Sequence, residues 1–110
     1  MIKNVPKPGR PVRGSRSGRP VMALIDLLGR RWVLRIVWEL RENPLTFRAL
    51  QQACGGLSPS VLNQRLGELR ETLLVELKPE GYALTALGGE LLMQLLPLTG
   101  WAEKWAKAIR

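Results

Sequence analysis

Hydroxyl, amide and guanidinium side chains gather between residues 58 and 72, where they can donate and accept hydrogen bonds. Ser58 and Pro59 are typical of a helix start, because serine caps free amides and proline has no amide to leave unpaired. Leucines then recur at steps of four, three and four residues, which predicts one apolar stripe made of Leu62, Leu66, Leu69 and Leu73. The opposite face carries Ser60, Asn63, Gln64 and Gly67, flanked by Arg65 and Arg70.

Hydroxyl and amide groups can donate and accept hydrogen bonds at base edges, and arginine can bind guanine with two hydrogen bonds. This outer face has no carboxylate before Glu68 and Glu71, so its N-terminal half suits a DNA groove and its C-terminal half does not. An ordinary surface helix could look the same. The preceding segment favours DNA, since Thr46 predicts the cap of a short helix to Ala53, and residues 54–57 form a turn with two glycines. Two helices joined by such a turn are typical of a helix-turn-helix.

Composition limits the other chemistry that this chain can perform. Its 110 residues include one cysteine and no histidine, which excludes an internal disulfide and zinc sites built from both residue types. With Asp26 as the only aspartate and scattered glutamates, no catalytic constellation and no phosphate-binding glycine loop can be assembled. We therefore expect no enzyme activity, cofactor or metal. No apolar run is long enough for a signal peptide or a membrane span, so we expect a cytoplasmic protein without a membrane partner.

The net charge of +8 is concentrated in the first 20 residues. Six of the 17 basic residues lie there without an acid, whereas residues 21–110 hold 11 bases against nine acids. Prolines and glycines separate these bases, so residues 1–19 cannot bury apolar area and are predicted to be disordered when free. A basic arm suits nucleic acid, although a solvated tail is the alternative. The basic residues of this arm are Lys3, Lys7, Arg10, Arg13, Arg16 and Arg19. We expect DNA contacts from Lys7, Arg10, Arg13 and Arg16.

The remainder, residues 20–110, is long enough for one domain. Apolar residues at helical spacing predict helices over residues 20–28 and from Arg30 to a stop at Asn43 and Pro44. Trp38 lies off the second stripe, and a wide core face is slightly favoured over a subunit contact. Residues 75–77 and 82–84 alternate around a turn with Pro and Gly, which predicts a β-hairpin. A hairpin directly after a helix-turn-helix is the wing of a winged helix, in a fold that is mainly α.

The C-terminal end is expected to be helical and unusually apolar. Thr85 is predicted to cap a helix, which Pro97 ends or kinks. In residues 98–110, Trp101 and Trp105 stand one helical turn apart, which is a large apolar area for so short a segment. They either cover the core of their own chain or pair with another subunit, and the second alternative is favoured.

The order of elements and several segments resemble the HxlR-type winged helix-turn-helix transcriptional regulators of bacteria and archaea. The matching segments are LIDLLGRRWVLRIVWELRENPLTFRALQQA, GGLSPSVLNQRLGELRETLLVE, YALTALGGELL and WAEKWA, within residues 20 to 107. The resemblance implies a homodimer formed by the first and last helices. It also implies that the second helix of the motif enters the major groove, with the wing near the adjacent backbone or minor groove.

The resemblance assigns roles to individual positions. The groove-facing residues would be Ser58, Ser60, Asn63, Gln64 and Arg65. Phosphate contacts would come from Thr46 and Arg48, with Lys78 on the wing. Subunit contacts would come from Val21, Leu24, Ile25, Leu98, Trp101, Trp105 and Ile109.

Two features depart from the family pattern. Many members carry a cysteine just before the Pro-Val that opens the first helix, and in some it senses oxidants or electrophiles. Arg19 occupies that position here, whereas Cys54 lies in the helix-turn-helix turn and is not the same site. The wing is also cut to a turn at residues 78–81, so we expect the basic arm to replace its DNA contacts.

These observations predict a homodimeric regulator that binds double-stranded DNA specifically at an inverted-repeat operator, with the recognition helix at residues 58–72. One alternative is a non-specific, architectural nucleic-acid-binding protein driven by the arm, and another is a protein-interaction module. A large ratio of specific to non-specific affinity would favour the first, a small ratio the second, and no DNA binding the third. No small-molecule effector follows from the sequence.

Overall fold

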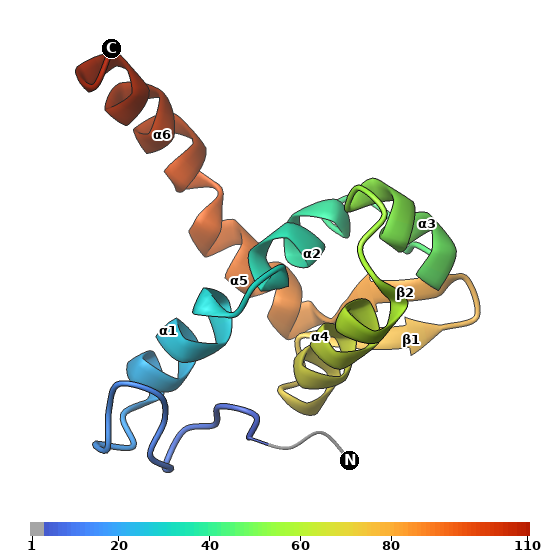
Figure 1. The fold of residues 1–110 in the computed structure, drawn as a ribbon, viewed down its shortest axis with the longest axis horizontal. Coiled ribbons are helices and arrows are strands. Elements are labelled where there is room, and N and C mark those ends of the chain that lie inside the picture. Colours follow the sequence, from blue (N-terminus) through green and yellow to red (C-terminus); the bar gives the residue numbers. More distant parts are fainter. Residues whose placement is uncertain (1–3) are drawn as a thin grey trace.

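The computed structural model describes residues 4–110, which form six helices and one antiparallel hairpin (Figure 1). The elements are α1 (Pro20–Gly29), α2 (Val33–Glu39), α3 (Phe47–Ala53), α4 (Pro59–Glu71), β1 (Val75–Lys78), β2 (Gly81–Leu84), α5 (Ala86–Leu95) and α6 (Pro97–Ala108). This order confirms the predicted, mainly helical chain with a small wing. No helix among residues 4–110 is long and apolar enough to cross a membrane.

Local capping defines where the helices begin. The side-chain oxygens of Thr46, Ser58 and Thr85 each accept a hydrogen bond from the amide three residues later. Each cap stabilises its helix by about 1 kcal/mol. The start of α2 differs from the prediction, because Arg30 and Arg31 form a turn and Trp32 adopts a left-handed conformation with φ 79°.

The core is formed mainly by α2, α3 and α4, and single residues of α1, β1 and α5 complete it. Leu50, Leu62, Leu66 and Leu69 are almost completely buried, together with Val33, Ile36 and Val37 of α2. This confirms the predicted stripe of α4 except at its last position. Leu73 is 67% exposed, because α4 ends at Glu71 and the backbone at Leu73 turns left-handed with φ 65°. Leu74 is buried in its place.

The wing is anchored to the start of the helix-turn-helix. Val75 pairs with Leu84, and the ladder ends where Lys78 pairs with Gly81. The backbone of Leu45 exchanges two hydrogen bonds with Tyr82, at 2.9 and 2.8 Å. Gly81 lies so close to the Leu45 carbonyl that a side chain there would collide with it. The short hairpin is therefore fixed relative to α3.

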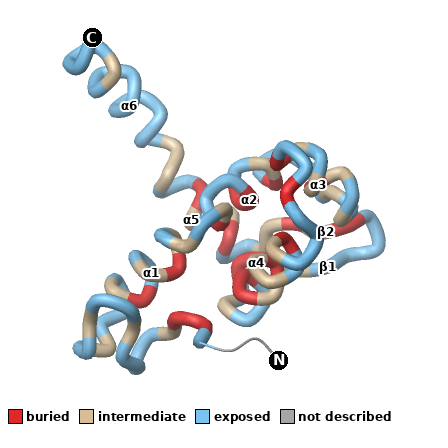
Figure 2. Tube along the Cα trace, viewed as in Figure 1, coloured by how far each residue is buried: buried red, intermediate tan, exposed pale blue. Residues whose placement is uncertain are grey.

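The C-terminal helix extends away from the rest of the chain (Figure 1). Leu96 keeps right-handed helical dihedrals, so α6 follows α5 with only a local break at Pro97, as predicted. No residue of α6 is buried, and Figure 2 shows this helix exposed along most of its length.

Trp38 is 38% exposed, so the predicted wide core face covers it only in part.

Residues 4–19 form an irregular arm beside α1 and the C-terminal end of α4. Val5 is buried, Lys7 Nζ lies 3.0 Å from Glu71 Oε2, and the Arg13 amide donates to Asp26 Oδ2 at 3.3 Å. The arm is thus placed against the domain in this conformation, whereas disorder of the free arm stays a prediction. Lys3 lies outside the described residues.

Candidate nucleic-acid interface

The turn between α3 and α4 fixes the angle at which α4 is presented. Gly55 and Gly56 both adopt positive φ, at 79° and 81°, a conformation that costs glycine little. The Gln51 side chain donates to the Leu57 carbonyl at 2.9 Å, and Leu57 itself is buried. The turn is therefore held by its own backbone conformation, by one side-chain hydrogen bond and by one apolar anchor.

The N-terminal half of α4 presents polar groups away from the core. Ser58, Ser60 and Asn63 are exposed, while the leucines of the same helix face inward. Ser58 Oγ caps the helix and lies 3.5 Å from Ser60 Oγ. Among residues 4–110, Asn63 makes no side-chain hydrogen bond, so its amide is available to a ligand. This half of the face carries no carboxylate.

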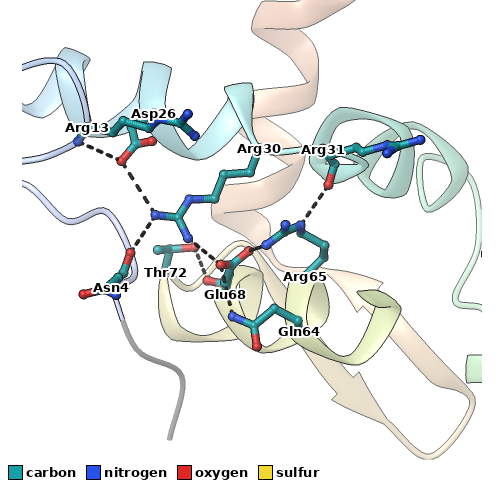
Figure 3. Close-up of polar contacts among 9 residues, drawn as sticks. All are labelled: Asn4, Arg13, Asp26, Arg30, Arg31, Gln64, Arg65, Glu68 and Thr72. Carbon is teal, nitrogen blue, oxygen red and sulfur yellow. Dashed lines mark hydrogen bonds and ion pairs between the residues drawn. The ribbon is translucent and has the colours of Figure 1, made fainter. Parts of the chain in front are cut away.

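Arg65 and Gln64 are held within the protein, unlike the outward-facing side chains that the sequence suggested. Arg65 Nε donates to the Arg31 carbonyl at 2.9 Å, and its Nη1 lies 2.7 Å from Glu68 Oε1 (Figure 3). Gln64 Nε2 lies 3.4 Å from Glu68 Oε2. The Arg65 side chain is 21% exposed, so part of the guanidinium still reaches the surface.

Glu68 was predicted on the outer polar face, and this placement is wrong. Its side chain is fully buried, because Arg30 reaches across from the turn after α1 and lies 2.6 Å from Glu68 Oε2. A buried carboxylate is stable only when it is paired, and here two arginines pair with it. Arg30 was not among the predicted site residues, and its only local signal in the sequence is its place directly after the helix-ending Gly29.

The remaining predicted DNA contacts are spread over three elements. Arg48 on α3 and Lys78 on the wing are exposed, and Thr46 uses its hydroxyl for the helix cap. Arg10 and Arg16 in the arm are exposed, whereas Lys7 is paired with Glu71. Arg13 lines a polar hollow of about 660 Å³ together with Asn4, Gly29, Arg30, Arg31, Gln64, Arg65 and Glu68. The structure thus brings one arm arginine close to the recognition helix.

The residues predicted to form a subunit contact are exposed apolar side chains on two separate helices, α1 and α6. Val21 and Ile25 are 55% and 56% exposed, and the Trp101 and Trp105 rings stack with centroids 6.0 Å apart. Leu24, Leu98 and Ile109 are exposed as well. The tryptophans therefore do not cover the core of their own chain, and the subunit contact stays a prediction.

Cys54 is buried at the end of α3. Burial raises the pKa of its thiol, an effect that nearby Arg35 opposes and Glu39 reinforces. The thiol therefore stays protonated near neutral pH, and a protonated thiol is a poor nucleophile. Residues 4–110 contain no group of three or more Cys, Asp or Glu side chains placed to hold a metal ion.

A capped helix-turn-helix, a polar recognition face and an attached hairpin define a winged helix-turn-helix protein. The chain belongs to the HxlR-like helix-turn-helix family, whose sequence model matches residues 27–110. It is thus a DNA-binding transcriptional regulator of the HxlR type.

Individual relatives are also helix-turn-helix transcriptional regulators. The HTH-type transcriptional regulator YvaP of Bacillus subtilis is 34% identical over 88 residues, covering 74% of this chain and 82% of that protein. The regulator MJ0925 of Methanocaldococcus jannaschii is 28% identical over 91 residues, with 79% and 86% coverage. The crystal structure of quinone-bound YodB from B. subtilis superposes with a TM-score of 0.72 at 28% identity, covering 76% of this chain and 96% of that one.

Proposed function

We propose that this protein acts as a homodimer on an inverted-repeat operator, with α4 in the major groove, and that it works by binding alone, without catalysis. The observation that carries the proposal is the N-terminal half of α4. Its exposed groups are hydroxyls and an amide without carboxylates, and its other face is locked into the core. Such a face can approach DNA without charge repulsion and still keep a fixed register.

Base reading is assigned to Ser60 and Asn63, with Gln64 and Arg65 contributing the groups that their internal contacts leave available. Asparagine recognises adenine through its N6 and N7 positions, and serine tolerates several bases. Phosphate contacts are assigned to Thr46 and Arg48 at the start of α3, and Ser58 is assigned to the groove at the start of α4. Lys78 is the one basic residue of the wing and Glu80 follows two residues later, so the wing adds little positive charge.

The homodimer is supported by the exposed apolar surface on α1 and α6. Half-exposed tryptophans, together with isoleucine, valine and leucine side chains, form a surface that a monomer would leave in water. A second copy of the chain would cover it by two-fold symmetry, since a two-fold interface uses the same surface on both subunits. The two α4 helices would then meet half-sites about one helical turn apart.

The arm is proposed to contact phosphates or a neighbouring minor groove. Arg10, Arg13 and Arg16 have no carboxylate partner for their guanidinium groups among residues 4–110. A disordered segment that is released from the domain can follow the DNA backbone.

The test is selection of bound duplexes from a random library, followed by affinity measurements at one salt concentration. The proposal expects an inverted repeat and a ratio of specific to non-specific affinity of about 10³ or more. A ratio near one would instead favour an architectural protein driven by the arm. No DNA binding at all would favour a protein-interaction module.

A further inference from the structure

The buried Glu68 lies directly behind the recognition face, on the same helix. Its Oε1 lies 2.7 Å from Arg65 Nη1, and its Oε2 lies 2.6 Å from Arg30 Nη1. Figure 3 shows the carboxylate between the guanidinium of Arg65, from α4, and that of Arg30, from the turn after α1. The Glu68 carboxylate therefore connects α4 to the turn between α1 and α2.

Carboxylates balance the charges of Arg30 and Arg65, the two arginines that contact Glu68, whereas Arg13 and Arg31 line the same hollow without a carboxylate partner among residues 4–110. Arg30 also lies 3.7 Å from Asp26 Oδ2 and donates to the Asn4 carbonyl at 2.6 Å. Two arginines thus meet two carboxylates. As a result, Arg65 offers DNA a guanidinium whose charge is already compensated, which weakens its attraction to any phosphate.

The internal contacts also decide which hydrogens of Arg65 remain available. A guanidinium has five N–H donors in a fixed plane. The Nε hydrogen is bound to the Arg31 carbonyl and one Nη1 hydrogen to Glu68, which leaves one hydrogen on Nη1 and both on Nη2. Two donors at the end of the fork are the arrangement that meets O6 and N7 of guanine. The two contacts hold the Nε and Nη1 sides of the guanidinium against the Arg31 carbonyl and the Glu68 carboxylate.

We propose that Glu68 is a positioning residue that sets the specificity of DNA reading through Arg65. It directs the free end of Arg65 at a base and cancels the charge that would otherwise bind phosphates of any sequence. Gln64, which lies on the same carboxylate, is held by the same contact. This inference rests on the proposed function, since it concerns the recognition helix that α4 provides.

The experiment compares Glu68→Gln with Glu71→Gln on the full chain. Both variants remove one negative charge from α4; Glu68→Gln releases Arg30 and Arg65, and Glu71→Gln releases Lys7. Only Glu68 contacts Arg65, so Glu71→Gln is the matched control. The affinities for the selected operator and for a random duplex of equal length are measured by titration at several salt concentrations.

For Glu68→Gln we expect tighter binding to the random duplex. Its slope of log affinity against log salt should steepen by up to about 0.9 for each additional phosphate bound. The ratio of operator to random affinity should fall about 5- to 100-fold, which corresponds to one lost base contact. For Glu71→Gln the ratio should stay at the parent value. In an Arg65→Gln background, Glu68→Gln should lower the ratio less than it does in the parent, because only the contact with Gln64 is left to lose.

Several results would overturn the inference. Equal ratios for Glu68→Gln and Glu71→Gln would remove the role of Glu68 and leave the proposed function intact. An equal loss of affinity for both duplexes would show that Glu68 is only structural. A parent protein that does not discriminate between duplexes would overturn the proposed function and this inference together.

Folding is checked by thermal melting under circular dichroism. If Glu68→Gln is unfolded, Glu68→Asp replaces it, because aspartate keeps the charge but is too short to hold both arginines in the same place. The inference then expects a reduced ratio with an unchanged salt slope. A parent-like ratio in Glu68→Asp would overturn it.

Discussion

Neutralising the arm arginines should weaken DNA binding in a way that depends on salt and not on base sequence. The perturbation is the triple change Arg10→Gln, Arg13→Gln and Arg16→Gln. It keeps Val5 and the contact of Lys7 with Glu71 in place, whereas deletion of the arm would remove both. The change therefore tests the charge of the arm separately from its packing.

The magnitude follows from the number of arginines without carboxylate partners. Each phosphate that is neutralised contributes about −0.9 to the slope of log affinity against log salt, so three arginines contribute up to about 2.7 per chain. We expect about half of that, because the arm must give up contacts with α1 and α4, and ordering it on DNA costs entropy. Lys7 should add less, since its charge is already compensated by Glu71.

The affinities of parent and variant for one operator duplex are measured at several salt concentrations. Binding is monitored through the fluorescence anisotropy of a labelled DNA strand. The matched control changes Lys104, Lys107 and Arg110 to glutamine, which removes the same charge from the exposed α6 end. The variant slope should be flatter than that of the control, while the ranking of operator variants stays unchanged. Equal slopes in variant and control would show that the arm is a solvated appendage that makes no phosphate contacts.

Three further predictions concern the recognition face, the subunit contact and the thiol. Asn63→Ala should lower operator affinity by about 1–3 kcal/mol and leave random-duplex affinity unchanged, and parent-like operator titrations would show that Asn63 reads no base. Replacing Trp101 and Trp105 together with serine should give monomers in sedimentation, and an intact dimer would rule out this interface. Because burial raises its pKa, the Cys54 thiol should stay protonated, so Cys54→Ser should bind DNA like the parent with or without mild oxidant. This prediction is contradicted if mild oxidant releases DNA from the parent protein but not from Cys54→Ser.

Local signals in the sequence were sufficient to predict most helix boundaries. Thr46, Ser58 and Thr85 were predicted as caps, and each accepts its hydrogen bond from an amide only three residues away. The leucine spacing of α4 predicted its buried face for the same reason, since one residue's position on a helix determines that of its neighbours. The wing followed from two short alternating runs around a turn.

The predicted burial and helix membership of residues were wrong just outside the ends of helices. Leu73 continues the leucine spacing, yet it is exposed because the helix ends two residues earlier and the backbone reverses its direction. Trp32 was assigned to the stripe of α2 but precedes the helix in a left-handed conformation. Periodicity describes a helix only while it continues, and no residue type here marks these ends as clearly as a glycine would.

The environment of Glu68 was decided by tertiary structure alone. Its place on α4, three residues after Arg65 and one before Leu69, puts it at the border between the polar and apolar faces. Whether such a border carboxylate meets water or protein depends on what packs beside it. Here that neighbour is Arg30, 38 residues earlier in the chain, on a turn that no helical period relates to α4. The spacing of leucines and the caps were enough to predict α4 and its polar outer face, because both depend on neighbours along one helix. The contacts that hold Gln64 and Arg65 depend on the packing of the α1–α2 turn, which no local pattern encodes.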